Sequence, residues 1–142
     1  MAVVMDAAAL NAFLKEVFQQ VSRDFNVEAV SEDEVTLRLL VGDHHLRPGG
    51  TISGPAMFGL VDVAAYVMTL ARIGPKALAV TTNCSIDFMR KPQAGVDLLA
   101  KARLLKLGKQ LSVCDVLVFS EGSDKPVARA SLTYAIAPKS MG

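Results

Sequence analysis

Apolar residues fill one long stretch in the middle of the chain, between a glycine-rich loop and a Gly-Pro pair. Between residues 56 and 71 they fall on every side of a helical projection, which predicts a helix that is buried all round. Pro55 suits the first turn of such a helix because proline lacks the N–H that would be unpaired there, and Gly74 suits its end. We therefore expect a central helix at residues 53–73.

The remaining chain first follows a helical and then an extended pattern. Asp6 can cap a first, amphipathic helix within residues 1–26. Alternating apolar and polar positions, separated by short turns, then predict six strands at residues 27–30, 35–41, 77–90, 96–107, 110–121 and 127–137. Long antiparallel strands that wrap one buried helix indicate an α+β fold in a single domain, residues 1–142, with a frayed tail at 138–142.

Asp62 is the one carboxylate inside the central helix, where an unpaired charge would be costly to bury. One explanation is a hydrogen bond to Tyr66, to Thr69 or to the backbone, since these two side chains share its helix face. The other explanation is a catalytic base or nucleophile beside a cleft. Gly54 favours the second, because N–H groups at a helix start can polarise a carbonyl oxygen.

The spacing of these two candidates has a geometric consequence. Gly54 and Asp62 are eight positions apart in the sequence, which is roughly 12 Å along a helix, so one chain cannot aim both at one carbonyl group. If both act on one substrate, two copies of the helix must lie antiparallel, with Gly54 of one chain facing Asp62 of the other. The chemistry would then require a dimer.

The composition fits a domain that buries further surface in an oligomer. Hydrophobic residues make up 51% of the 142 residues and charged residues only 20%. The formal net charge is +1 and no long basic run occurs, so nucleic acid is not an expected partner. The central helix is long enough to raise the question of a membrane span, but Asp62 and the amphipathic strands argue against one.

Cysteines and histidines lack the spacing of a metal site. Cys84 and Cys114 each lie in a strand pattern, so we expect buried free thiols and, with no signal peptide evident, a cytoplasmic location. His44 and His45 are adjacent, and on an extended backbone they would point to opposite sides. We therefore expect solvated loop histidines and no metal ion. Arg47, in the same loop, could bind an anionic group or could simply be solvated.

The segment HLRPGGTISGPAMFGLVDVAAY resembles the signature of the PaaI-like acyl-CoA thioesterases, whose usual pattern is HLN-P-x-G-T-x-H-G-G-x-x-F-x-L-x-D. The resemblance continues through TTNCSIDFMRKP, LLKLGKQLSVCDVLV and VARASLTYAI, and so covers nearly everything after about residue 27. It implies the hotdog fold, in which a curved antiparallel sheet wraps one long central helix. It also implies a homodimer, or a dimer of dimers, whose sites draw on both chains.

The resemblance also implies roles for particular residues. Asp62 matches the family's catalytic carboxylate, which acts as a general base or as a nucleophile, and Gly54 matches the glycine whose N–H polarises the thioester. Thr81 falls where relatives often place a hydroxyl that orients the water, although threonine is also simply favourable in strands. Strict alternation places Thr81 on the polar face of its strand.

Three positions depart from the family pattern. Ser53 replaces the histidine before the glycine, Pro55 replaces the second glycine, and Arg47 replaces the asparagine. A serine can still form a hydrogen bond, and Pro55 leaves the N–H of Gly54 intact. Arg47 adds a charge near the expected thioester, where it could bind a carboxylate or hydroxyl on the acyl group or pair with Asp62.

Coenzyme A carries phosphates, so a protein that uses it should offer cations. Candidate phosphate-binding residues lie at strand ends and turns: Arg90, Lys91, Gly108 and Lys109. Candidate walls for the acyl group lie on the central helix, at Met57, Phe58 and Tyr66, although ordinary core packing is the more common role of such residues.

These residues favour an acyl-CoA thioesterase that uses Asp62 as base or nucleophile and Gly54 as the oxyanion donor, with no cofactor beyond the CoA of the substrate. Ser53 and Arg47 motivate an alternative, a noncatalytic acyl-CoA-binding or sensing protein. A hotdog hydratase would need a histidine paired with an acid near the helix start, whereas His44 and His45 lie upstream in the loop.

Overall fold

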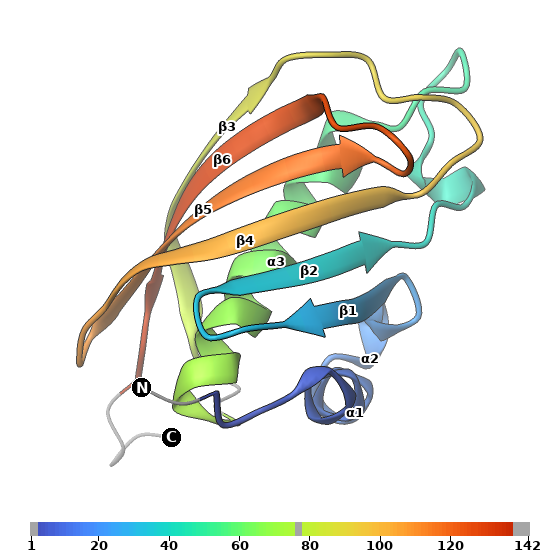
Figure 1. Cartoon of the computed structure of the whole chain (residues 1–142). Helices are drawn as coiled ribbons and strands as arrows, with labels where there is room; N and C mark the ends of the chain where they lie inside the picture. Colours follow the sequence, from blue (N-terminus) through green and yellow to red (C-terminus); the bar gives the residue numbers. More distant parts are fainter. Residues whose placement is uncertain (1–2, 76–77, 138–142) are drawn as a thin grey trace.

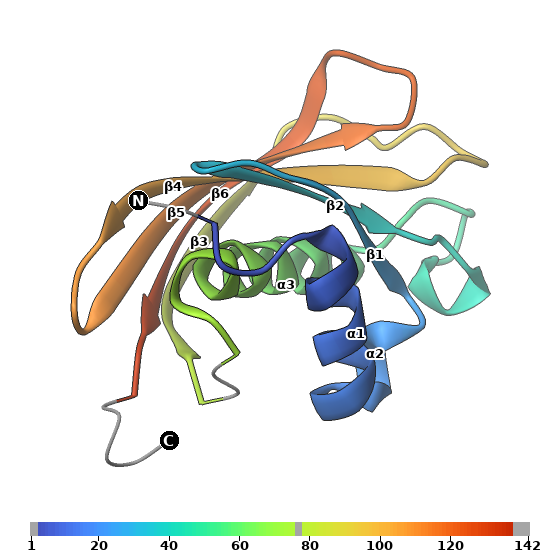
Figure 2. The same ribbon diagram turned by 60° about the horizontal axis from the view of Figure 1, so that its bottom comes forward.

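A six-stranded antiparallel sheet curves around one long helix in the computed structural model, which describes residues 3–75 and 78–137. Figures 1 and 2 show helix α3 (Gly54–Ile73) against the concave face of the sheet. The strand order is β1-β2-β4-β5-β6-β3. The strands are β1 (Phe25–Val30), β2 (Glu34–Leu39), β3 (Val80–Phe88), β4 (Leu98–Leu107), β5 (Leu111–Ser120) and β6 (Pro126–Ala135). This is the hotdog fold that the resemblance implies. The predicted tail lies outside the described residues.

Helix α3 begins and ends as its sequence predicts. The Ser53 hydroxyl accepts a hydrogen bond from the N–H of Ala56 at 3.2 Å, and Gly74 follows the last turn with φ 92°. The helix is apolar and long enough to cross a membrane, but 67% of its apolar 18-residue window is buried inside the fold.

The prediction that α3 is buried all round is wrong for one face of its N-terminal half. Pro55, Phe58, Gly59 and Asp62 are exposed or only half-buried. Their spacing puts them on one helix face. Phe58 is 42% exposed, which is unusual for an aromatic side chain on a core helix. Within this single chain, α3 therefore keeps one uncovered stripe.

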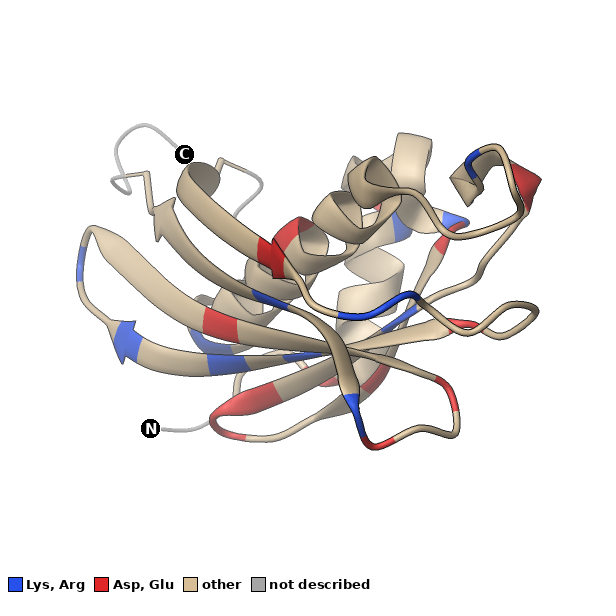
Figure 3. Ribbon diagram, turned by 90° about the horizontal axis from the view of Figure 1, so that it is seen from above, with Lys and Arg blue, Asp and Glu red and all other residues tan. Residues whose placement is uncertain are grey.

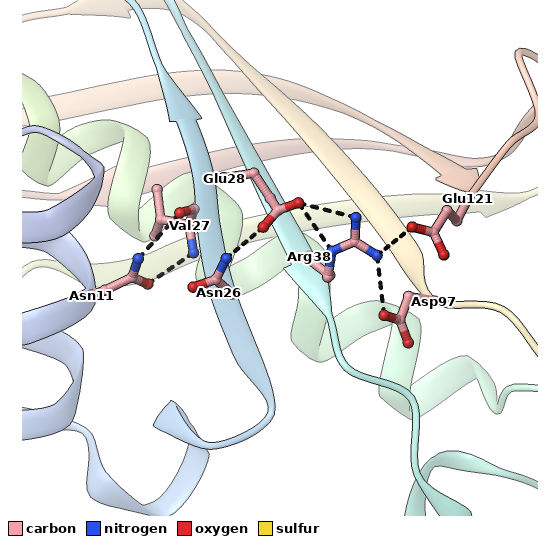
Figure 4. Close-up of polar contacts among 7 residues, drawn as sticks. All are labelled: Asn11, Asn26, Val27, Glu28, Arg38, Asp97 and Glu121. Atoms are coloured by element: carbon pink, nitrogen blue, oxygen red, sulfur yellow. Dashed lines mark hydrogen bonds and ion pairs between the residues drawn. The ribbon is translucent and has the colours of Figure 1, made fainter.

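The two edges of the sheet differ. At the β1 edge, the Asn11 side chain accepts a hydrogen bond from the Val27 N–H at 2.8 Å and donates one to the Val27 carbonyl at 3.1 Å (Figure 4). This amide takes the place of a neighbouring strand. At the β3 edge, no strand pairs with the outer side of β3 within residues 3–75 and 78–137. The free edge also carries exposed apolar side chains, with Val80 55% and Phe88 53% exposed.

A bulge in β3 changes which side chains face the helix. Thr81 pairs with Tyr134 and Asn83 with Thr133, so Thr82 is an extra residue in the strand. Thr81 therefore points toward α3, as Cys84 does. Strict alternation would have placed it on the opposite, polar side of the strand. The prediction for the Thr81 face is wrong because alternation cannot reveal a bulge.

The N-terminal helix is shorter than expected and is broken. Asp6 caps α1 (Ala7–Val17) by accepting a hydrogen bond from the Ala9 N–H at 2.9 Å. Phe18 then leaves helical geometry, with φ −133° and ψ 52°, before the short helix α2 (Gln19–Ser22) begins. Figure 2 shows both helices beside the β1 edge of the sheet.

One guanidinium joins the β1–β2 hairpin to the ends of β4 and β5. Arg38 donates hydrogen bonds to Glu28 at 3.0 Å, to Asp97 at 3.1 Å and to Glu121 at 2.7 Å (Figure 4). The hydrogen bond with Glu121 makes the largest contribution to raising the pKa of Arg38 above its ordinary value, followed by those with Glu28 and Asp97. The side chain is only 19% exposed, so water replaces these partners poorly.

Replacing Arg38 by methionine is expected to destabilise the fold by about 2 kcal/mol, because three carboxylates lose their shared charged donor. Thermal unfolding should then show a Tm lower by about 6 °C. The matched control is Arg129→Met, whose ion pair with Asp87 is two-thirds exposed and should contribute less than about 1 kcal/mol. Equal losses of Tm in the two variants would contradict the prediction.

Candidate functional site

Asp62 lies half-buried on α3 and is held through one of its two carboxylate oxygens. The Thr81 hydroxyl donates a hydrogen bond to Oδ1 at 2.5 Å, and the Tyr134 hydroxyl donates to the same oxygen at 2.7 Å. Tyr134 also lies 2.8 Å from the backbone carbonyl of Asp62. Within the described chain, no hydrogen bond reaches Oδ2. One oxygen is therefore fixed in place, and the other is available to a ligand.

Tyr134 is a contact that the sequence did not predict. Burial, followed by the charge of Asp62, raises the pKa of Tyr134 above its ordinary value, so its hydroxyl stays protonated and acts as a donor. Alternation along the last strand does place Tyr134 on the inward face with Leu132. No pattern in the sequence pairs it with Asp62. The hydrogen-bond partners that the sequence left open, Tyr66 and Thr69, do not bond the Asp62 side chain in the described structure.

Thr69 instead belongs to a separate polar contact deeper in the core. Its hydroxyl donates to the Ala65 carbonyl at 2.9 Å and lies 2.8 Å from the Ser112 hydroxyl. Burial raises the pKa of Tyr66, which stacks on Tyr134 with ring centroids 6.0 Å apart. Tyr66 is therefore an aromatic wall beside the carboxylate.

Asp62 opens into a pocket of about 330 Å³. Its polar side is formed by Asp62, Thr81 and Tyr134. Its other lining residues are Val17, Phe18, Tyr66, Ala79 and Val80. The residues around the α1–α2 break, Val17 and Phe18, were not predicted as part of the site, because nothing in their helical pattern indicates which face meets a pocket.

The Gly54 end of the helix lies away from this pocket. A Cβ atom placed on Gly54 would lie 3.5 Å from the Phe88 ring, so Gly54 adjoins the far end of β3, whereas Asp62 adjoins Thr81 near its start. Thr81 and Phe88 are separated by roughly 23 Å of strand. The Ser53 hydroxyl caps α3 through the Ala56 N–H. One chain thus keeps the two predicted catalytic ends apart.

Arg47 lies exposed in the loop before α3. Its backbone N–H donates to the Thr51 carbonyl at 2.8 Å, and its carbonyl accepts from Gly50 at 3.0 Å. Among the residues that the structure describes, its guanidinium makes no ion pair with Asp62. The chain itself therefore does not make the Arg47–Asp62 pair that the sequence left open, and binding of an acyl substituent stays a prediction.

The predicted phosphate-binding residues fall at two opposite ends of the sheet. Arg90 and Lys91 follow β3 at the Gly54 end, where Arg90 donates to the Pro126 carbonyl at 2.7 Å. Gly108 and Lys109 form the β4–β5 turn, at the end of the sheet where β6 finishes beside Leu111. Positive and negative segments alternate over the strands and loops in Figure 3. One chain does not gather these cations into a single rim.

The prediction of solvated histidines holds for His44 but is wrong for His45, and the predicted orientation of the two rings is wrong. A short 3₁₀ turn (Asp43–His45) replaces the extended backbone, and the His44 and His45 ring centroids lie 3.8 Å apart. Both Nε2 atoms face Asp24, at 3.0 Å for His44 and 3.5 Å for His45. His45 is buried, whereas His44 stays exposed. The histidines therefore share one carboxylate and do not point apart.

This cluster is nevertheless a poor metal centre. The Gly42 N–H donates to His45 Nδ1 at 2.9 Å, so the proton of the neutral ring belongs on Nε2, facing Asp24. A histidine that binds metal through one nitrogen normally donates a proton from the other. The His45 carbonyl also accepts the Ser53 N–H at 2.8 Å, which links the cluster to the start of α3. We interpret it as a brace for this loop.

The cysteines behave as the sequence predicts. Cys84 and Cys114 are both free, with Cys114 buried and Cys84 half-buried. Burial raises the pKa of Cys114 to about 11, and burial and the charge of Asp62 raise that of Cys84. Both thiols are therefore poor nucleophiles at neutral pH. A cytoplasmic location stays a prediction.

Comparisons with known proteins identify the family and the fold. A sequence model of the thioesterase superfamily matches residues 49–127. The crystal structure of a provisionally named thioesterase from Silicibacter sp. TM1040 is 56% identical, with a TM-score of 0.91 over 97% of this chain and 96% of that one. A mutant of the phenylacetic acid degradation protein PaaI from Thermus thermophilus is 25% identical, with a TM-score of 0.69 over 89% and 99%. A curated relative from Thermoplasma acidophilum, provisionally named an esterase, is 23% identical over 90% of each chain.

Proposed function

Because the chain belongs to the thioesterase superfamily, we propose that it hydrolyses acyl-CoA thioesters to a free acid and CoA, as a homodimer with two shared sites. The observation that carries the proposal is the arrangement of Asp62 in its pocket. Thr81 and Tyr134 fix Oδ1, and Oδ2 remains free beside apolar walls. A carboxylate oriented in this way suits a general base or a nucleophile.

The reaction uses water as its second substrate. With Asp62 as general base, Oδ2 takes a proton from water while the water oxygen bonds to the thioester carbon. The C–S bond then breaks, the CoA sulfur receives the proton, and the acid is released. With Asp62 as nucleophile, Oδ2 bonds to the carbon and the C–S bond breaks, so that CoA leaves as a thiolate, which takes a proton from water. A water molecule then cleaves the resulting anhydride, which releases the acid and restores the Asp62 carboxylate. In both routes Thr81 orients the carboxylate, and the Gly54 N–H stabilises the oxyanion.

The proposed site needs a dimer because a single chain holds Gly54 and Asp62 too far apart to act on one substrate. A two-fold axis that places Gly54 of one chain next to Asp62 of its partner must pass near the midpoint between these residues on α3. It must likewise pass near the midpoint between Thr81 and Phe88, the β3 residues that adjoin them. Phe58 is midway between residues 54 and 62 on α3, and the point midway between residues 81 and 88 on β3 falls between Cys84 and Ser85. We therefore propose that Phe58 packs against its own copy on the axis.

Three features of the single chain support this dimer. The uncovered stripe of α3 surrounds Phe58, and the apolar edge of β3 has no partner within the described chain. The β1 edge, in contrast, is already occupied by Asn11. Pairing of β3 with its own copy would extend the sheet across the axis and cover both surfaces.

The surroundings of Gly54 are compatible with an external ligand. A side chain at this position would meet only the Phe88 ring, at an ordinary contact distance, so packing within the chain does not require glycine. Its N–H is the first of the helix and has no acceptor inside the helix. In the dimer, Arg90 and Lys91 would adjoin the partner's pocket and could bind the phosphates of CoA.

The test is release of free thiol from short, long and aromatic acyl-CoAs by the purified protein. We expect multiple turnovers with at least one of these substrates. Stoichiometric binding of acyl-CoA without thiol release would favour the noncatalytic acyl-CoA-binding alternative, which Ser53 and Arg47 motivate. Hydration of an enoyl-CoA would favour a hydratase instead. Either result would overturn the proposed hydrolysis.

A further inference from the structure

We propose that Phe18, at the break between α1 and α2, is the end wall of the acyl pocket and limits the length of the acyl chain. This inference rests on the proposed thioesterase reaction at Asp62. It gives the N-terminal helices a role in substrate choice, although they lie outside the residues 49–127 that match the superfamily.

Three aromatic rings connect this wall to the carboxylate. The Phe18 ring meets the edge of Tyr66 at a centroid distance of 6.3 Å, and Tyr66 stacks on Tyr134 at 6.0 Å. The Tyr134 hydroxyl reaches Asp62 at 2.7 Å. An acyl chain whose carbonyl carbon lies at Asp62 would therefore follow these rings and end at Phe18.

The lining of the pocket sets this direction. Asp62, Thr81 and Tyr134 supply its hydrogen-bonding groups, Ala79 and Val80 supply apolar side chains beside Thr81, and Val17 and Phe18 supply the apolar side chains at the α1–α2 break. A volume of about 330 Å³ is near the lower end of small-molecule sites, roughly 300–1,000 Å³, so it suits an acyl group and not a nucleotide. The nucleotide of CoA must therefore lie outside this pocket.

The Phe18 backbone is held on both sides of the break. Its N–H donates to the Leu14 carbonyl at 2.9 Å, and its carbonyl accepts from Val21 at 3.1 Å and from Ser22 at 3.0 Å. Leu14 is buried, and the Asn11 amide fixes α1 to β1. A wall held at these points can discriminate between chain lengths, because it cannot retreat without breaking them.

The experiment compares kcat/KM for butyryl-, hexanoyl-, octanoyl-, dodecanoyl- and palmitoyl-CoA in the full-length protein. In Phe18→Ala, the ratio of dodecanoyl to hexanoyl activity should rise by about tenfold or more, because the truncated wall admits further methylenes. In Phe18→Trp, the same ratio should fall by about tenfold. These opposite shifts distinguish a wall from a general loss of stability.

Phe13→Ala is the matched control. Phe13 lies on α1, the helix that ends just before Phe18, and packs against the core, but it does not line the pocket. Its substitution should leave the chain-length ratio unchanged even if Tm falls. An unchanged ratio in both Phe18 variants, or an equal change in Phe13→Ala, would overturn the inference.

Binding measurements separate this inference from the proposed function. Nonhydrolysable acyl-CoA thioethers of the same chain lengths can be titrated into wild type and both Phe18 variants by calorimetry. If no thioester is hydrolysed but Phe18→Ala still gains affinity for the longer chains, the proposed function is wrong and the inference that Phe18 limits chain length is supported. If hydrolysis proceeds and the Phe18 substitutions change neither the affinity nor the chain-length profile of activity, the inference about Phe18 is wrong and the proposed function is unaffected.

Discussion

Asp62→Asn is expected to lower kcat by about 10²–10⁴-fold, because asparagine cannot accept a proton from water or attack a thioester. The substitution is nearly isosteric. The asparagine carbonyl can still accept from Thr81 and Tyr134 at the Oδ1 position, so the pocket should keep its shape. Steady-state thiol release with the best substrate measures the loss.

The control for this variant is Asp115→Asn, the same chemical change on the outer face of the sheet. Asp115 is exposed, and its Oδ1 lies 3.2 Å from the Ser131 hydroxyl, away from the Asp62 pocket. Its kcat should stay within about twofold of wild type, since surface substitutions have small effects. Both variants should also keep the wild-type Tm within a few degrees. An Asp62→Asn enzyme with wild-type kcat would remove Asp62 from the mechanism.

Two heterodimers that carry the same pair of inactivating substitutions should differ in activity. We expect substantial activity only when the substitutions lie on different chains. Gly54→Pro removes the N–H proposed to bind the oxyanion and should lower kcat by about 10²–10³-fold. A heterodimer of an Asp62→Asn chain with a Gly54→Pro chain has one damaged site and one site with both groups intact, if each site draws on both chains. We expect about half of the wild-type kcat per dimer.

The reciprocal heterodimer carries both substitutions on one chain and none on the other. Each of its shared sites then contains one substituted residue, so activity should stay about 10²-fold or more below wild type. Two different affinity tags allow each heterodimer to be purified before the thiol-release assay. If the two groups act within one chain, the results are reversed, and the shared-site proposal is wrong.

The sequence predicts the central features of this fold because they depend on local patterns. Helix α3 follows from its predominantly apolar run between Ser53 and Gly74, and the strands follow from alternation between turn residues. Asp62 stands out as a carboxylate in an apolar helix. The family resemblance suggested Thr81 as a site residue that orients the water, but neither it nor the sequence pattern predicted the hydrogen bond to Asp62, and alternation placed Thr81 on the wrong face.

The remaining parts of the site depend on events that leave no local pattern. The extra residue in β3, which turns Thr81 inward, appears only in the register against β6. Tyr134 reaches Asp62 across 72 positions of sequence. The turn at His45 likewise brings two neighbouring histidines to Asp24 from a distant segment. Each is a tertiary contact, and single-sequence patterns report mainly secondary structure.

The exposed edge of β3 should make the stability of this protein depend on its concentration, because the edge is covered only in the proposed dimer. Within the described part of the chain no strand covers this edge, and its exposed apolar residues Val80 and Phe88 make it a template on which unrelated chains could aggregate. Self-association would protect that surface, so dilution that dissociates the dimer should expose the edge and lower turnover together. Selection against misassembly would then preserve this edge even in a descendant that had lost its catalytic carboxylate.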